Sequence, residues 1–599
     1  MAYATRIGPA ELPAQVPAHH PGQNMKKTRV YQNSAFSQKP HSQFRHRIII
    51  GVDFGTTYSA IAWGSSSDPD SIEIINSWPT SGARVLDSCP TEISYHEGST
   101  TEFSWGYDIP STARRLAWFK LLLESDDPDI KRKVNIPEGL DVMDVCTDFL
   151  HALYNHTMET LYRKKGNQVM EITQVDFVLT VPAVWNDGAK QRTQKCAENA
   201  GFANGHRLTM ISEPEAAAVF CIKNQDAHNI KASDRIVVCD AGGGTVDLIT
   251  YNCLEITPRL RVRECAVGEG AFAGSSKIDR NFAEFFKERM GQSNFEKLRL
   301  ETQQKVIKNF ENIKCGFRDR PDQAIYTVTV PTVNNLPEAG IENGEMLITR
   351  EEMRALFDPV ITEVITLIYN QIKETSENAG RVNTILLVGG FGESLYLYQR
   401  VVEWAGPYGI NVIQPRSAAT AIVKGAVIRG LEIHLDASNP GRTQVERLCR
   451  KNYGTVSSQI FIEGKHLPED AWIDPQTGKK MARNQVSWFI RKGQPLTDER
   501  RFSNHFHRNF KHITPFLDAM VASSSDNPPN RVEGDVHVVC RMTSDLSSVP
   551  KNLFDKKWKS LRSFYSARYR LDMTIESAEI KFELVYKERS YGFAQCQFD

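Results

Sequence analysis

The chain lacks the features that mark several large classes of protein. No uncharged apolar run reaches the ~18 residues that a membrane-spanning helix needs. The charges cancel, with 72 Lys and Arg against 72 Asp and Glu, so no overall field attracts nucleic acid or an anionic membrane surface. We therefore expect no nucleic-acid partner and no membrane span.

A cysteine framework and a secretory signal are also missing. The 11 cysteines are scattered without a Cys-x-x-Cys pair, which is typical of free thiols in a reducing compartment. Residues 1–47 carry seven Lys or Arg against one acidic residue, and prolines interrupt their start. This composition favours a disordered basic leader over an import signal. We expect a cytoplasmic protein, with a nuclear location as the alternative.

The common phosphate-binding motifs are absent as well. No G-x-x-x-x-G-K-[ST] loop occurs, and Gly268, Gly270 and Gly274 have the wrong spacing for a dinucleotide fingerprint. The sequence Asp-Phe-Gly at residues 53–55 stands without the other protein-kinase signatures. Any nucleotide site must therefore be of another kind.

Two segments that lie far apart in the sequence follow one plan. An apolar strand at residues 48–52 leads into Asp-Phe-Gly-Thr-Thr, and another at residues 235–239 leads into Asp-Ala-Gly-Gly-Gly-Thr-Val-Asp. A third buried strand, residues 384–388, ends in Gly-Gly-Phe-Gly. Glycine lets a backbone approach phosphate oxygens, and a carboxylate at the strand end suits a hydrated magnesium ion. The pattern predicts two related halves that face one phosphate site.

The remaining chain indicates an α/β region followed by a β-rich one. Strand 176–181 precedes a helix to about residue 200, and an apolar stripe over residues 350–372 predicts a helix that Pro359 should kink or break. After residue 436 the apolar residues alternate, for example over residues 532–539 and 579–586, which predicts strands with one wet face. We expect a loop at residues 523–530 in the same region.

Five motifs in order resemble the 70-kilodalton heat-shock (Hsp70) chaperone family of the actin and sugar-kinase superfamily. The five segments are residues 50–59, 181–187, 212–218, 240–247 and 387–394. The resemblance covers about residues 48–431. It implies an α/β fold, namely a two-lobed actin-like ATPase domain with a duplicated ribonuclease-H-like fold, over residues 48–436. A smaller β-rich domain would follow at residues 437–599.

The resemblance also implies a site for ATP or ADP with Mg²⁺. Asp53 and Asp240 would hold the hydrated ion, and Lys120 would offset charge on the transferred phosphoryl group. The other implied catalytic residues are Glu213 and Thr245. The implied nucleotide-binding residues are Gly55, Thr56, Thr57, Tyr58, Gly242, Gly243, Gly244, Asp247, Glu311, Lys314, Gly389, Gly390 and Phe391. Two plainer interpretations stay open: Lys120 as a surface lysine, and Glu311 with Lys314 as an ordinary i,i+3 ion pair.

The chain departs from the family pattern in two places. Lys190 stands where the family has an arginine that relays the nucleotide state, and lysine lacks the planar donor fork. The 163 residues after position 436 are too few for the family's peptide-binding domain and its full helical lid. We expect a degenerate substrate-binding domain there.

The functional prediction is an ATP-binding, weakly hydrolysing, chaperone-like protein with client polypeptides as possible partners. The alternatives are a nucleotide-dependent scaffold or signalling protein without foldase activity, and a sugar kinase of the same superfamily.

One segment of the tail permits two interpretations. Residues 500–512 interleave aromatic and basic side chains, as platforms for single-stranded nucleic acid do. The favoured interpretation is a solvated strand whose Phe502, Phe506 and Phe510 pack inward.

Overall fold

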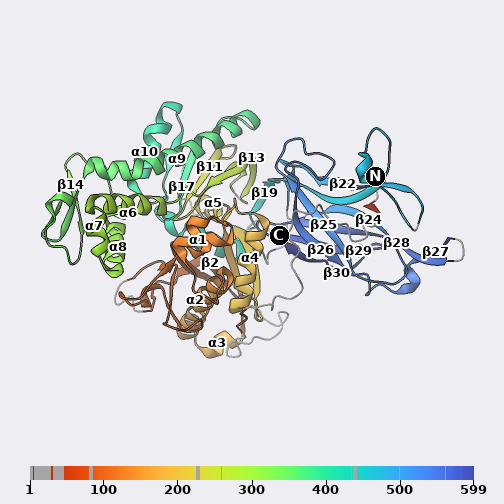
Figure 1. Ribbon diagram of the computed structural model, residues 1–599, viewed down its shortest axis with the longest axis horizontal. Coiled ribbons are helices and arrows are strands. Elements are labelled where there is room, and N and C mark those ends of the chain that lie inside the picture. The colour runs from red at the N-terminus through yellow and green to blue at the C-terminus, as the bar shows by residue number, and fades with distance from the viewer. Residues whose placement is uncertain are drawn as a thin grey trace. The chain divides into compact units, whose positions relative to one another are not determined.

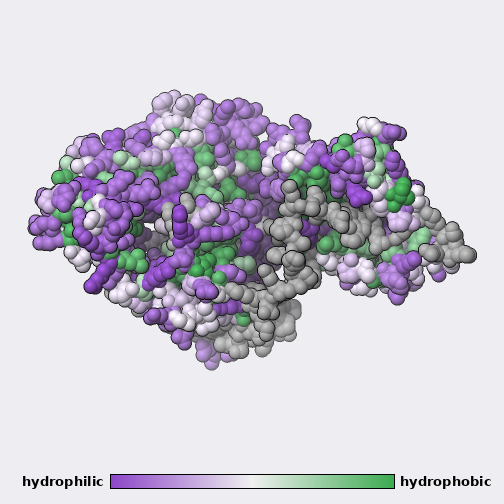
Figure 2. All heavy atoms as spheres, in the orientation of Figure 1, coloured by the Kyte–Doolittle hydropathy of each residue, from purple (hydrophilic) through white to green (hydrophobic). Residues whose placement is uncertain are grey.

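The protein consists of two compact units, drawn in Figure 1. The computed structural model describes residues 4–5, 29–31, 46–79, 85–223, 230–257, 259–433, 435, 442–475, 477–497, 500–559 and 562–598. The larger unit is Arg29–Val445, and the smaller unit combines Met1–Thr28 with Glu446–Asp599. Most of the predicted basic leader lies outside the described residues. Figure 2 shows mainly hydrophilic residues on the viewed surface of the described parts.

The first sheet of the larger unit has the strand order β10-β9-β2-β3-β4. Its strands are β2 (His46–Asp53), β3 (Tyr58–Ser65), β4 (Asp68–Ile74), β9 (Thr173–Val181) and β10 (Arg207–Ser212). β2 is antiparallel to β3 and parallel to β9, and β9 is parallel to β10. All nine residues of β9 are buried, as expected for a strand covered on both faces. β2 ends at Asp53.

The second sheet contains five strands of the larger unit in the order β18-β17-β11-β12-β13. They are β11 (Arg235–Ala241), β12 (Val246–Glu255), β13 (Arg261–Ala271), β17 (Thr384–Val388) and β18 (Asn411–Ile413). β11 is antiparallel to β12 and parallel to β17, and β17 is parallel to β18. Asp240 therefore lies near the end of β11 as Asp53 lies at the end of β2.

Two helices pack between these sheets. Their shared core joins Ile49 of β2 and Val238 of β11 with residues of α5 (Glu213–Lys223) and α11 (Ala421–Glu432). The helices touch at backbone distance, because a Cβ on Gly425 would lie 1.8 Å from the carbonyl oxygen of Ala216. Only glycine permits this approach, which brings the two sheets toward one site.

The remaining helices of the larger unit pack on the sheets or on one another. They are α1 (Pro128–Val134), α2 (Val142–Lys165), α3 (Asn167–Glu171), α4 (Asp187–Ala197), α6 (Ser276–Met290), α7 (Gln292–Lys297), α8 (Leu300–Gly316), α9 (Arg350–Asn378) and α10 (Leu395–Ala405). α9 begins with a reciprocal capping box between Thr349 and Glu352 and runs on through Pro359. Of the two predicted effects of Pro359, a kink or a break, the break is therefore wrong. No helix of the described residues is long and apolar enough to cross a membrane.

Two residues of the predicted leader lie against α2. Arg29 and the Tyr31 hydroxyl both donate to the buried carboxylate of Asp148, at 2.7 Å for Tyr31. The Tyr31 ring stacks on His151 with centroids 3.6 Å apart, and its backbone N–H donates to the carbonyl of Asn199. These contacts give the buried Asp148 charge its partners.

The smaller unit is built from strands, and its described residues contain two short 3₁₀ helices and no α-helix. Its longer strands are β20 (Asn452–Ile460), β22 (Lys480–Ile490), β24 (Phe502–Phe510), β25 (Phe516–Ser523), β26 (His537–Ser544), β28 (Arg562–Ile575) and β29 (Ile580–Tyr586). The shorter ones are β1 (Ala4–Thr5), β21 (Ala471–Ile473), β23 (Pro495–Leu496), β27 (Asp555–Lys559), β30 (Arg589–Phe593) and β31 (Gln595–Phe598). β29 confirms the strand expected at residues 579–586.

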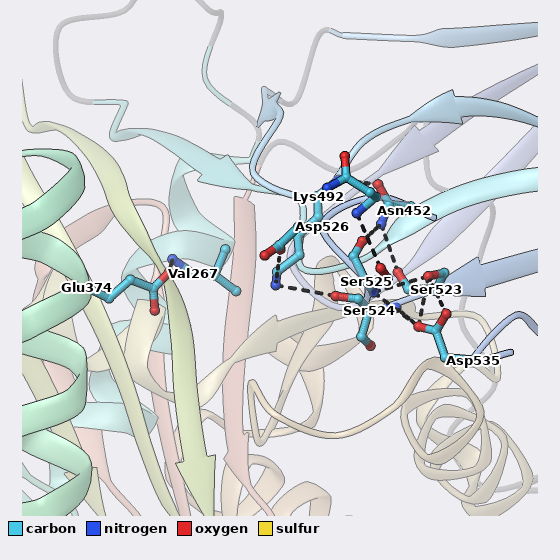
Figure 3. Close-up of polar contacts among 10 residues, drawn as sticks. Val267, Glu374, Asn452, Lys492, Ser523, Ser524, Ser525, Asp526 and Asp535 are labelled. Carbon is cyan, nitrogen blue, oxygen red and sulfur yellow. Dashed lines mark hydrogen bonds and ion pairs between the residues drawn. The ribbon is translucent and has the colours of Figure 1, made fainter. Parts of the chain in front are cut away.

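The predicted strand at residues 532–539 begins later than expected. β26 starts at His537, because Gly534 adopts a positive φ of 63° in a turn just before it. Asp535 in this turn accepts hydrogen bonds from the Ser523 hydroxyl and from the backbone N–H groups of Ser524 and Ser525 (Figure 3). These bonds fix the start of the predicted loop at residues 523–530.

A second set of bonds holds the same loop from the opposite side. The buried side chain of Asn452 donates to the carbonyls of Ser523 and Ser525, and Lys492 forms an ion pair of 3.0 Å with Asp526 (Figure 3). These groups surround a polar hollow of about 450 Å³.

The aromatic and basic segment of the tail forms a core strand. Phe502, Phe506 and Phe510 are buried in β24, which confirms the favoured interpretation of this segment. Arg508 of the same strand is also buried and donates to Asp518 of β25, which accepts a second bond of 3.2 Å from Tyr569. An ion pair thus lies inside the apolar core of the smaller unit.

We expect the variant Asp518→Ala to weaken the smaller unit by about 3–5 kcal/mol, because it leaves the Arg508 guanidinium buried without its counter-charge. Asp526→Ala is the matched control, since its carboxylate is exposed and its ion pair with Lys492 contributes at most about 1 kcal/mol. Amide hydrogen exchange of β24 and β25, read by mass spectrometry, measures both. Equal protection in the two variants would contradict the prediction.

Candidate functional site

Carboxylates from both sheets converge at one place. Asp53 accepts a hydrogen bond of 3.1 Å from the Thr180 hydroxyl of β9. Asp247, at the start of β12, accepts one of 2.9 Å from the backbone N–H of Val184. Asp240 and Glu213, the first residue of α5, complete the group. Three of these four acids are buried and Asp53 is half-buried.

Lys120 is the cation inside this group. It lies in a short 3₁₀ helix, Phe119–Leu123, and donates a hydrogen bond of 3.1 Å to Glu213. Its Nζ also lies 5.0 Å from the ring centre of Trp185 and 5.5 Å from that of Phe54. The side chain is 2% exposed, so the interpretation of Lys120 as an ordinary surface lysine is wrong.

One lysine does not balance four acids. Burial raises the pKa of Glu213 to about 8, against the lowering effect of Lys120 and with the help of Asp53 and Asp247. Burial also raises the pKa of Asp240 well above its ordinary value, and Glu213, Asp247 and Asp53 add to this by repulsion. The buried Oδ1 of Asp240 has no hydrogen-bond partner among the described residues. This excess of negative charge fits a bound cation.

The donor set fits a hydrated ion better than a directly ligated one. Among the described residues, no three His, Cys, Asp or Glu side chains are close enough to hold a metal directly. Mg²⁺ usually keeps several of its waters and contacts proteins through one or two carboxylates. Asp53 and Asp240 could hold it through water, as the sequence predicts.

The two glycine turns face each other in direct contact. A Cβ on Gly243 would lie 2.1 Å from the hydroxyl of Thr57, and one on Gly244 would lie 2.5 Å from that of Thr56. Gly242 closes its turn by donating to the carbonyl of Thr245. The predicted phosphate-binding residues Thr56, Thr57 and Gly242–Thr245 are thus brought together. Gly55 lies in the first turn, and Tyr58 begins β3 directly after it.

A further glycine, which the sequence interpretation did not assign to the site, supports the second turn. The backbone N–H groups of Gly274, Ser275 and Ser276 donate to the carbonyls of Gly244, Gly242 and Gly243, respectively, so the turn satisfies the first N–H groups of α6. A Cβ on Gly274 would lie 2.4 Å from the backbone of Gly243. Its position just after β13 gives no local signal of this contact.

The third glycine turn reaches the carboxylates from β17. Gly389 has a φ of +84°, and a Cβ there would lie 2.4 Å from Oδ1 of Asp240. The N–H of Phe391 donates to the carbonyl of Ala241 at 2.8 Å, and Phe391 is buried. Gly390 is exposed at the tip of the turn.

The predicted pair on α8 has other partners than expected. Glu311 accepts from the Tyr58 hydroxyl at 2.7 Å and from Lys308 at 2.6 Å. Lys314 pairs with Asp279 of α6 at 2.7 Å. The structure therefore does not support the plain i,i+3 ion pair between Glu311 and Lys314. The sequence interpretation did not include Lys308 and Asp279. Asp279 pairs with a lysine of another helix, and Lys308 reaches Tyr58 of β3 as well as Glu311 of its own helix.

The fold and this site define an actin-like ATPase domain with a β-rich region after it. A family model described as Hsp70 protein matches residues 127–433, about half of the chain. The chain belongs to the Hsp70 family. A second model, described as a domain of unknown function (DUF8568), matches residues 447–597.

Individual relatives agree with this assignment. Heat shock 70 kDa protein 12B of Homo sapiens is 26% identical over 559 residues, which cover 77% of this chain and 79% of the relative. Heat shock 70 kDa protein 12A of Homo sapiens is 24% identical over 523 residues, 72% and 75% of the two chains. Chaperone protein HscA of Photorhabdus laumondii is 25% identical over 405 residues, 63% and 57% of the two chains. Such identities mark a divergent family member.

We expect Gly274→Ala to weaken nucleotide binding at least about tenfold, because the added methyl displaces the Gly243 backbone and costs about 1–3 kcal/mol. Gly316→Ala is the matched control, since its Cβ would meet nothing within 4 Å. Fluorescence titration with a labelled adenine nucleotide and Mg²⁺ measures both. Equal affinities would show that Gly274 does not support the turn.

The raised pKa of Glu213 predicts how stability changes with pH. Its neutral form favours the folded state, so this contribution is present below the unfolded pKa near 4.5 and is lost as pH rises through about 8. Without nucleotide, we expect the free energy of unfolding to fall by on the order of a few kcal/mol between about pH 5 and pH 8.5. Glu213→Gln should flatten this fall in a thermal-unfolding series. The same slope in both proteins would contradict the assignment.

Proposed function

We propose that the chain binds Mg·ATP in a cleft of a two-lobed ATPase domain and hydrolyses it slowly. The observation that carries this proposal is the convergence of Asp53, Asp240, Glu213 and Lys120 beside two facing glycine turns. Members of the Hsp70 family bind ATP or ADP with Mg²⁺. A bound Mg²⁺ would supply charge neutralisation for the phosphates.

The residues of the chain have separable roles in this proposal. The hydroxyls of Thr56, Thr57 and Thr245 and the backbone N–H groups of the glycine turns bind phosphate oxygens. Lys120 places its charge beside the transferred phosphoryl group. Glu213 and Asp247 orient water through their oxygens, and Glu213 can exchange a proton near neutral pH because its pKa is about 8.

The adenosine end of the nucleotide would lie toward α8 and the third turn. Glu311, Lys314 and the turn Gly389 to Phe391 contact it in this proposal. Two contacts support the assignment. Gly389 lies directly beside the carboxylate of Asp240, and Lys314 forms an ion pair with Asp279 of α6.

A duplicated, ribonuclease-H-like origin of the two lobes is supported by strand pairing. In both sheets the first strand is antiparallel to the second and parallel to the fourth, counted in chain order, and each first strand carries the site aspartate. We propose an ATPase domain at residues 48–436 and a β-rich domain at residues 437–599. The division into units at Val445 and Glu446 lies close to this boundary.

The β-rich domain is proposed as a degenerate substrate-binding domain without a full helical lid. Family members bind client polypeptides, and the described residues of Glu446–Asp599 contain no α-helix that could form such a lid. Clients are therefore proposed as partners of this chain. A cytoplasmic location agrees with the state of the cysteines, which are all free thiols.

A scaffold role without foldase activity is the second candidate. Lys190 stands at the position of the family's relay arginine and donates to the carbonyl of Ala183 at 3.4 Å, without the planar pair of donors that an arginine has. Arg192 lies two residues further on, and its Nε donates to the carbonyl of Leu123. The signature of a scaffold is ATP binding with negligible turnover. A sugar kinase would instead show turnover that a sugar stimulates.

Isothermal titration with Mg·ATP tests the proposal. We expect saturable binding that Asp240→Asn and Asp53→Asn each weaken at least about tenfold, because each removes charge that faces the ion. Asp126→Asn is the matched control, since Asp126 is exposed and forms only a surface ion pair with Lys131. Binding that is absent, or equal in all variants, would refute the proposed site.

A further inference from the structure

β1 fills a gap in the sheet of the smaller unit. β24 pairs with β28 over all nine of its residues, from Phe502 to Phe510. On the other side of β24, the described strands provide only β1, with Ala4 opposite Phe506 and Thr5 opposite His507. β1 also pairs with β20, where Thr5 lies opposite Ser458. The N-terminal strand is therefore inserted between β20 and β24.

The gap begins where the pairing of β25 with β20 ends. β25 pairs with β20 from Asn452 to Thr455 and not beyond. At Thr455 the side chains bridge β20 and β24 directly, because Asn504 donates to the Thr455 hydroxyl at 2.6 Å. From Ser458 onward a strand can enter between them, antiparallel to β20 and parallel to β24. We call this gap, bounded by Ser458, Phe506 and His507, the strand slot.

One exposed apolar side chain lies beyond the strand slot on β20. Ile460 ends this strand and is 60% exposed, whereas Ile473, also 60% exposed, ends β21, which pairs with β22. The loop between these strands adds the exposed Ile462 and Leu467. Figure 2 shows hydrophobic atoms at the surface near the place where Figure 1 labels β22. Exposed apolar groups of this kind mark surfaces that bind other polypeptides.

We propose that the strand slot is a binding site for an extended segment of another polypeptide, and that β1 is the internal occupant that such a segment displaces. Main-chain hydrogen bonds to β20 and β24 give the affinity, and the exposed Ile460 at the end of β20 favours a segment with apolar residues. The identification of that polypeptide as a client rests on the proposed function, whereas the slot itself does not involve the nucleotide site.

The fraction of molecules in which β1 occupies the strand slot determines how often another segment can enter it. Because β1 belongs to the same chain, it competes with an incoming segment without having to diffuse to the site. The apparent affinity for the segment is then reduced by the fraction of molecules in which β1 has left the slot. Whatever holds or removes the N-terminal residues therefore regulates binding.

The test measures binding of a fluorescent peptide with the sequence of residues 1–10 to the full chain, by anisotropy. Two variants open the slot: a chain that lacks residues 1–7, and Thr5→Pro, which removes a main-chain donor and fixes φ. Thr5→Val is the matched control, because it keeps the backbone N–H and favours a strand. We expect both open variants to bind at least about tenfold more tightly than the full chain and the Thr5→Val control.

Hydrogen exchange provides a second readout on the same proteins. Removal of residues 1–7 should speed exchange of the amides near Phe506 and Ser458, and the added peptide should slow it again. Equal peptide affinity in all four proteins, or protection at other strands only, would overturn the proposal. An unlabelled peptide of alternating Thr and Ile should compete. If it does not, the slot takes only a second copy of this N-terminus, and the proposed partner is wrong.

The two proposals fail separately in this design. Mg·ATP binding is measured on the same truncated chain, whose nucleotide-site residues are unchanged. Loss of ATP binding in the intact chain counts against the proposed function alone, and an unaltered peptide affinity counts against the strand slot alone.

Discussion

The larger unit is organised around an imbalance of charge. Four carboxylates from two sheets and one helix share a single buried lysine, and burial raises the pKa values of Glu213 and Asp240. Such a group is costly inside a protein unless protons or a cation neutralise it. The glycine turns, the crossing of α5 and α11 at Gly425, and the support from α6 all bring backbone close to this one place. The fold therefore brings these charged groups and the glycine turns together at one place, which is the basis for the proposed nucleotide site.

Local chemistry explains which parts of this site the sequence predicts. A buried strand that ends in Asp and glycine is visible in a few consecutive residues, so β2, β11 and β17 and their turns follow from the pattern. Lys120 also follows from the family resemblance, although only the structure distinguishes a buried lysine from a surface one. Gly274 could not be predicted, because its partners lie on a turn distant in sequence. Lys308 forms an ordinary i,i+3 pair with Glu311, and only the structure shows that it also reaches Tyr58.

In the smaller unit, the sequence predicts less of the observed structure. The inward phenylalanines of β24 follow from their alternation, but β26 begins later than predicted because the turn at Gly534 precedes it. The insertion of β1 beside β24 has no sequence signal at all, since two residues carry no periodicity. The Hsp70 family model thus matches the region that carries the glycine turns after β11 and β17, whereas residues 447–597 match a separate domain of unknown function.

The claim that a magnesium nucleotide neutralises these buried acids can be measured directly. Calorimetric titration of Mg·ADP in buffers of different ionisation enthalpy gives the number of protons exchanged on binding. At about pH 7.5 Glu213 is largely protonated, so binding that favours its ionised form should release protons, and Glu213→Gln should reduce the release. Binding without proton release, or with the same release in the variant, would contradict the account.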